Sequence, residues 1–119
     1  MTQLYLLKIS ENEEVFYKVG RSINITRRVK ELSKFYSTIE VVWYSSRFIW
    51  SGVERLEYFF HKDFKNKSYK PLKYFAGCSE CYTYLNPAVM RNYLKTNKHM
   101  ITISPYGKGK IEGVNLLWL

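Results

Sequence analysis

The chain has 119 residues, of which 46% are hydrophobic, and it carries a formal net charge of +9 at pH 7. This length and apolar content suffice for one hydrophobic core and predict a single domain. The N-terminus lacks the pattern of a secretory signal, and no apolar run approaches the roughly 20 residues that span a bilayer. These features argue against a secreted or membrane-spanning protein and predict a soluble, cytoplasmic one.

The positive charge is the first indication of a partner. A strongly basic small protein creates a field that attracts polyanions, so nucleic acid is the first partner to consider. Charge alone fits equally well a protein that merely stays soluble or that touches an anionic membrane.

Two β-prone runs open the chain. Residues 3–9 (QLYLLKI) and 15–19 (VFYKV) are joined by a polar stretch at 10–14, which is a hairpin pattern. We expect Gly20 to end the second strand.

A helix and a third strand should follow. Asn24 can cap a helix that ends near Tyr36, and 39–44 is β-branched and aromatic like a third strand of the same sheet. The apolar residues that recur at helical spacing are Ile25, Val29, Leu32 and Phe35.

A second helix should start at Ser51. The sequence Ser51-Gly52-Val53-Glu54 has the capping-box pattern, which assigns Glu54 to a structural role. Its predicted apolar stripe is Val53, Leu56, Phe60 and Phe64. Glu57 and His61 are four residues apart and share a neighbouring face.

The remainder predicts a basic loop at 65–73, a short helix at 88–94 after Pro87, and a flexible basic turn at 107–113 before an apolar end at 114–119. The expected fold class is α+β, with a small three-stranded, mainly antiparallel sheet flanked by helices. One domain, 1–119, would comprise a motif-bearing core at about 3–82 and a C-terminal extension at 83–119.

Cys78 and Cys81 form a CxxC pair. A zinc site would have to recruit both His61 and His99 from distant parts of the chain. We favour two reduced, partly buried thiols in a tight turn beside Gly77.

Two motifs carry a family resemblance: Tyr17-Lys18-Val19-Gly20-Arg21-Ser22-Ile23-Asn24-Ile25-Thr26-Arg27-Arg28, and Glu57-Tyr58-Phe59-Phe60-His61. In order, spacing and placement on strands and helices, the chain resembles the GIY-YIG nuclease superfamily. It is most similar to a phage-associated branch with the motifs Y-K-[IV]-G-x-[ST]-x-N-x-x-x-R and E-x-x-x-H.

The resemblance implies a metal-dependent endonuclease that hydrolyses phosphodiester bonds in nucleic acid, with DNA the expected substrate. Glu57 would be the sole protein ligand of one Mg²⁺ or Mn²⁺ ion. The alternative is a solvated glutamate on a helix surface.

Further site residues follow from the same resemblance. Arg28 matches the family's arginine, and its neighbour Arg27 points about 100° away on the helix, so only one can face the site. Tyr17 would act as general base or orient the attacking water, and Tyr5 would bind the phosphate. Both could instead be ordinary strand tyrosines.

His61 could bond the metal shell or the scissile phosphate, or could simply be a half-buried polar residue. Lys18 alternates to the opposite face of the strand from Tyr17, and we expect it to be solvated.

Nucleic acid would be held mainly through its phosphates. Tyr69 or Tyr74 could stack or pack against the backbone. Sequence specificity would need loops, a homodimer or a separate specificity partner. The expected phosphate-binding residues are Arg21, Arg27, Lys30, Lys65, Lys67, Lys70 and Lys73.

The sequence departs from the pattern in two places. Gln3-Leu4 replaces Gly-Ile before Tyr5, and the family's closing asparagine has only Asn86 as a candidate counterpart.

Two other functions remain open: a catalytically inactive nucleic-acid-binding or accessory module, and a structural protein whose exposed aromatic residues dock a protein partner. We favour the enzyme because Tyr5, Tyr17, Arg28 and Glu57 are all present.

Overall fold

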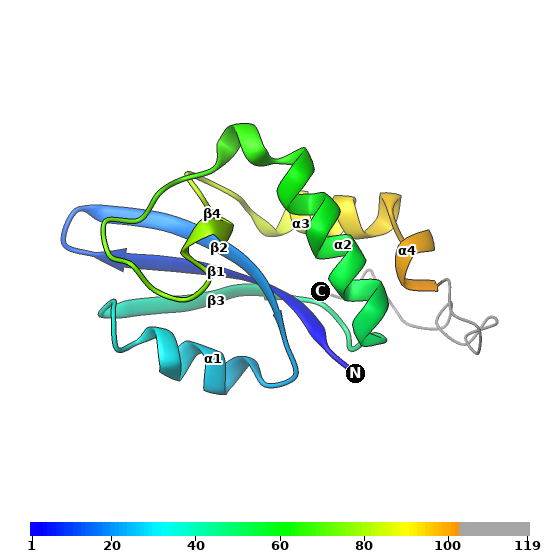
Figure 1. Cartoon of the computed structure of the whole chain (residues 1–119), viewed down its shortest axis with the longest axis horizontal. Coiled ribbons are helices and arrows are strands. Elements are labelled where there is room, and N and C mark those ends of the chain that lie inside the picture. The colour runs from blue at the N-terminus through cyan, green and yellow to red at the C-terminus, as the bar shows by residue number, and fades with distance from the viewer. Residues whose placement is uncertain (103–119) are drawn as a thin grey trace.

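The computed structural model describes residues 1–102, which form an α+β domain with helices on both faces of one antiparallel sheet (Figure 1). The predicted turn at 107–113 and apolar end at 114–119 lie outside this range. None of the described helices is long and apolar enough to cross a membrane.

The sheet has four strands and not the predicted three. Their order is β3-β1-β2-β4, and all neighbouring strands are antiparallel. The extra strand, β4, is only two residues long, too short to give a β-prone run in the sequence. The strands are β1 Gln3–Glu11, β2 Glu14–Ser22, β3 Thr38–Tyr44 and β4 Cys81–Tyr82.

The hairpin of β1 and β2 is confirmed. Its last pair is Glu11 with Glu14, and Asn12 in the turn has a positive φ of 55°. The expectation that Gly20 ends the second strand was wrong, because Gly20 pairs with Tyr5 and β2 continues to Ser22.

The first helix, α1, runs over Ile25–Leu32. The predicted cap is confirmed, since the Asn24 side chain accepts a hydrogen bond of 3.0 Å from the Arg27 backbone N–H. The helix ends earlier than predicted, at Leu32, and Phe35 is 40% exposed. The chain turns there because Tyr36 is drawn inward, where its hydroxyl donates to Glu14 at 2.8 Å.

The second helix, α2, covers Trp50–Asp63. The predicted capping box is wrong, because the helix starts one residue before Ser51, and its cap, Ile49, makes no side-chain hydrogen bond. The backbone N–H groups of Gly52 and Val53 bond to the Ile49 carbonyl. Ser51 therefore lies inside the first turn, and Glu54 is free of a capping role.

Two apolar cores lie on the two faces of the sheet, and different helices cover these two faces (Figure 1). One is covered by α1 and includes Tyr5, Leu7, Phe16, Leu32 and Tyr36. The other is covered by α2 together with α3 (Pro87–Thr96) and α4 (His99–Thr102), and includes Leu4, Leu6, Val19, Leu56, Phe60, Met90, Leu94 and Ile101. Side chains from 85–101 thus complete the core on which α2 rests.

The basic loop after α2 is anchored to the hairpin by Glu14. After a short 3-10 helix, Lys65–Lys67, the loop supplies the Tyr69 hydroxyl, which donates to Glu14 at 2.6 Å, and the Leu72 backbone N–H, which donates at 2.9 Å. Burial alone would raise the pKa of Glu14, but these donors and Tyr36 outweigh it and hold the pKa below its usual value.

We predict that Glu14→Gln destabilises the fold at neutral pH by about 1–3 kcal/mol, because a charged acceptor of several hydrogen bonds is lost. The folded-state pKa lies below the unfolded one, so this stabilisation is present at neutral pH and is lost as the pH falls through the folded-state value. Urea unfolding of wild type and variant at pH 7 and at about pH 3 measures the loss of stability and its dependence on pH. The difference between wild type and variant should shrink in acid, and a difference that stays constant would contradict this account.

Candidate functional site

The candidate site lies where the end of β2 faces α2. A short 3-10 helix, Cys78–Glu80, leads into β4, which pairs with Tyr17 and Lys18 of β2. Beyond that pairing lie two cavities, of about 170 Å³ and about 910 Å³. Arg21, Glu57 and Glu80 line both cavities and so mark the centre of the site.

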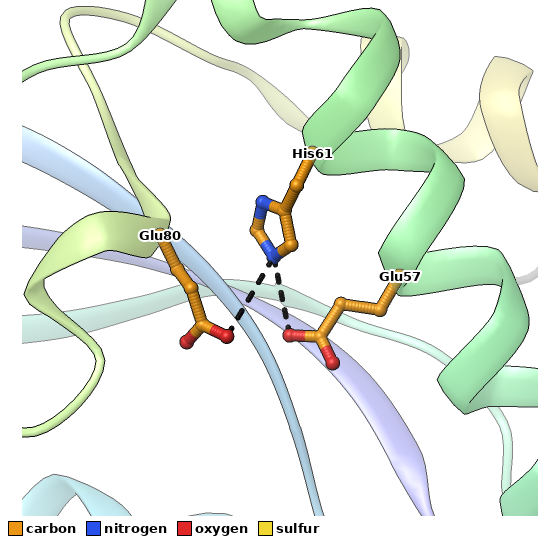
Figure 2. Close-up of side chains that lie close together, drawn as sticks. All are labelled: Glu57, His61 and Glu80. Carbon is orange, nitrogen blue, oxygen red and sulfur yellow. Dashed lines mark hydrogen bonds and ion pairs between the residues drawn. The ribbon is translucent and has the colours of Figure 1, made fainter.

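Glu57, His61 and Glu80 form a cluster of side chains that could hold a metal ion (Figure 2). One ligand atom from each lies within 4.8 Å of the others. The Nε2 atom of His61 is 3.2 Å from a carboxylate oxygen of Glu57 and 3.9 Å from one of Glu80. Two residues come from one turn of α2 and the third from the segment before β4.

Glu57 is not a solvated surface glutamate, because it is only 3% exposed. Its carboxylate accepts hydrogen bonds from Arg21 and lies against His61. Burial would raise the pKa of Glu57, but His61 and Arg21 outweigh burial and lower it. The site therefore holds a buried carboxylate that stays ionised at neutral pH.

His61 is held in orientation by Tyr82 of β4. Its Nδ1 atom shares a hydrogen bond with the Tyr82 hydroxyl, and the two rings stack at an interplanar angle of 4°. Burial is the main cause of a raised pKa of Tyr82, so the hydroxyl stays protonated. With Nδ1 engaged, Nε2 is the nitrogen presented to the two carboxylates (Figure 2).

Lys18 was expected to be solvated, and that expectation is wrong: the residue is 0% exposed. Its Nζ atom lies 3.0 Å from a carboxylate oxygen of Glu80 and 3.3 Å from the Tyr5 hydroxyl. The face of β2 to which Lys18 points is covered by the segment around Gly77. Gly77 has a φ of 88°, and any side chain at this position would bring its Cβ to 2.9 Å from Lys18 Cε, so only glycine fits here. Burial would lower the pKa of Lys18, but Tyr5 and Glu80 raise it, so the amine stays charged.

Tyr5 and Arg28 line the smaller cavity together with Gly20. A Cβ at Gly20 would overlap the Tyr5 hydroxyl, so glycine is needed where the two strands pair. Burial would lower the pKa of Arg28, but its interaction with Tyr5 raises it. Arg27 is exposed and does not line this cavity, which favours Arg28 as the arginine of the site.

Tyr17 is not brought to this cavity. Side chains alternate along a strand, so Tyr17, three residues before Gly20, points to the face opposite Tyr5, and Lys18 points to the same face as Tyr5. The Tyr17 ring instead packs edge-on against Tyr84 at 5.3 Å. The relative faces of the two tyrosines follow from the register of the hairpin, in which Tyr5 pairs with Gly20.

Arg21 was expected to contact nucleic acid, and here it joins the carboxylates of α2. It bonds Glu57, lies 3.1 Å from Glu54, and places its guanidinium 4.6 Å from the Trp50 ring centre. Glu54 is therefore a partner of Arg21 and not part of a cap.

Glu80 was missed by sequence reasoning. Nothing in its local sequence distinguishes it, and only the pairing of β4 with β2 carries it to Lys18 and His61. Asn86 lines neither cavity. Its side chain caps α3, where it accepts a hydrogen bond of 3.0 Å from the Val89 backbone N–H.

The two cysteines are free thiols, as expected, and follow Gly77 in its left-handed conformation. Burial raises the pKa of Cys81 to about 12. Within residues 1–102 neither cysteine joins His61 or His99 in a metal-binding group, so the zinc alternative gains no support.

The predicted phosphate-binding residues are dispersed. Lys65 lines the larger cavity, whereas Lys30, Lys67 and Lys70 are exposed elsewhere. The Lys73 ammonium already has partners within the protein: it forms an ion pair with Glu11 and donates a hydrogen bond of 2.7 Å to the Phe35 carbonyl.

Comparison with known proteins gives one match. The family model described as the T5orf172 domain matches residues 2–98, which includes the hairpin, α2 and β4. Searches of curated proteins and of solved structures found no match. The chain belongs to the T5orf172 domain family.

Proposed function

We propose that this protein is a divalent-metal-dependent nuclease of the GIY-YIG type that hydrolyses phosphodiester bonds, with DNA as the expected substrate. The observation that carries the proposal is the cluster of Glu57, His61 and Glu80 beside a cavity lined by Tyr5 and Arg28. Membership of the T5orf172 family, which is associated with phage and endonuclease-like proteins, supports a nucleic-acid-related role.

The donor set fits a hard divalent cation. Glu57 and Glu80 offer carboxylate oxygens, which Mg²⁺ and Mn²⁺ prefer, and the His61 imidazole favours Mn²⁺ of the two. The ligand set therefore extends beyond Glu57 alone. When bound, the ion would neutralise charge on the phosphoryl group and lower the pKa of a bound water.

The protein's own residues would complete the chemistry. Arg28 presents a guanidinium to the smaller cavity, where it can pair with two phosphate oxygens. Lys18 holds a fixed positive charge beside the Tyr5 hydroxyl and orients that hydroxyl.

The GIY-YIG assignment is supported by placement. Tyr5 on β1, Arg28 on α1 and Glu57 on α2 all reach one cavity, as the resemblance implies. Tyr17 is the exception, and a general-base role for it is withdrawn from the proposal.

The experiment is cleavage of labelled DNA and RNA, single-stranded and duplex, by the purified protein with Mn²⁺, with Mg²⁺ or with EDTA. We expect cleavage with at least one of the ions and none with EDTA. Binding of these substrates without cleavage under any condition would overturn the nuclease proposal.

One observation favours a second candidate function, an inactive nucleic-acid-binding module. Glu57 and Glu80 already have cationic partners, Arg21 and Lys18, which balance their charge without a metal. Calorimetric titration with Mn²⁺ separates the two functions, because the inactive module would bind no ion at this cluster.

A further inference from the structure

The exposed side of α2 and the residues just after it carry a row of basic and aromatic side chains next to the site: Arg55, Tyr58, Lys62 and Lys65, here named the α2 track. We propose that the α2 track binds a single-stranded segment of nucleic acid and leads it to Glu57, His61 and Glu80. This inference rests on the proposed function and adds the substrate class and its path.

Helix geometry places these side chains in one row. Arg55, Tyr58 and Lys62 are separated by three and four residues, the spacing that keeps side chains on one face, and Lys65 follows just beyond the helix end. All four line the same cavity of about 910 Å³ as Glu57 and His61. The row therefore borders the metal-binding cluster directly.

The charges of the track are available to a ligand. Within residues 1–102, no ion pair engages Arg55, Lys62 or Lys65. The remaining acidic groups that line the cavity are Glu54 and Glu57, both paired with Arg21, and Glu80, paired with Lys18. The outer part of the cavity is thus positive.

The length of the row suits a strand and not one isolated phosphate. Arg55 and Lys62 are seven residues apart, which is about 10 Å along a helix at about 1.5 Å per residue. One phosphate group cannot span that distance, so Arg55 and Lys62 would contact different phosphates of the same strand.

The exposed ring of Tyr58 is the feature that favours single-stranded over duplex nucleic acid as the ligand. It is 64% exposed although aromatic, and it stands between Arg55 and Lys62 in the row. An exposed ring flanked by cations is the arrangement on which unpaired bases stack. In a duplex the base faces are already stacked on each other and cannot use such a ring.

The test is fluorescence anisotropy of a labelled oligothymidylate of about 12 nucleotides, within the usual site size, in EDTA so that no cleavage occurs. Tyr58→Ala should weaken binding about tenfold or more, and Tyr58→Phe, which keeps the ring, should not. Tyr84→Ala is the matched control, because Tyr84 is 58% exposed, close to the 64% of Tyr58, but lies outside the cavity. Arg55→Gln and Lys62→Gln should each reduce the slope of log K against log salt by about 0.7.

The proposal is overturned if Tyr58→Ala binds like wild type, if Tyr84→Ala causes the larger loss, or if a duplex of equal length binds as tightly as the single strand and with the same response to Tyr58→Ala. Because these assays contain no metal, such a result leaves the nuclease proposal to be decided separately, by cleavage that depends on the ion.

Discussion

Glu57→Gln should lower metal-dependent cleavage about a thousandfold. Glutamine keeps the shape of the buried side chain but removes the ionised oxygen that would ligate the cation, and the charge stabilisation a bound ion supplies is worth several kcal/mol, or about three powers of ten in rate. Calorimetric titration with Mn²⁺ should show the same loss independently of catalysis.

The matched control for this variant is Glu54→Gln. Glu54 lies on the same helix and also bonds Arg21, but its side chain is 57% exposed and it is not part of the cluster of Glu57, His61 and Glu80. We expect cleavage within about tenfold of wild type, because exposed ion pairs contribute little. Loss of cleavage and of Mn²⁺ binding in Glu54→Gln, with both retained in Glu57→Gln, would transfer the ligand role to Glu54.

The sequence predicted those parts of the fold that depend on interactions between residues close together in the chain. The hairpin, the third strand and the Asn24 cap all follow from side-chain alternation, β-branching and one side-chain acceptor, each of which acts within a few residues. The capping box failed because Ser51 matches the pattern while the N-cap is Ile49, and a four-residue pattern cannot say where the preceding loop ends.

The site was only half predictable for a related reason. Tyr5, Arg28 and Glu57 are carried by regular elements whose order the sequence motifs define. Glu80 and the orientation of His61 depend on β4, which pairs with β2 across more than 60 intervening residues. No local property of a two-residue strand indicates such a pairing.

The error about Lys18 is of another kind. Its face of the strand was predicted correctly, but solvent was expected on that face. A buried ammonium is costly unless partners compensate it, and the partners, Glu80 and the Tyr5 hydroxyl, come from segments whose positions the local sequence around Lys18 does not indicate.

Lys18→Met should reduce cleavage about a hundredfold while changing the free energy of unfolding by less than about 2 kcal/mol. The stability effect is small because methionine removes the cost of burying an ammonium, and the Glu80 side chain left behind is still 32% exposed to water. The activity effect is larger because Tyr5 loses the fixed charge that orients its hydroxyl, and removing one such preorganised donor costs about a hundredfold or more.

Metal affinity distinguishes this role from a merely structural one. Lys18→Met removes a positive charge 3.0 Å from Glu80, so Mn²⁺ should bind the variant more tightly even as cleavage falls. Lys8→Met, on the neighbouring strand and outside both cavities, is the control and should change neither quantity. If Lys18→Met instead lost affinity and cleavage together with its folded structure, the lysine would be a packing element, and the orientation of Tyr5 would have to come from Arg28 alone.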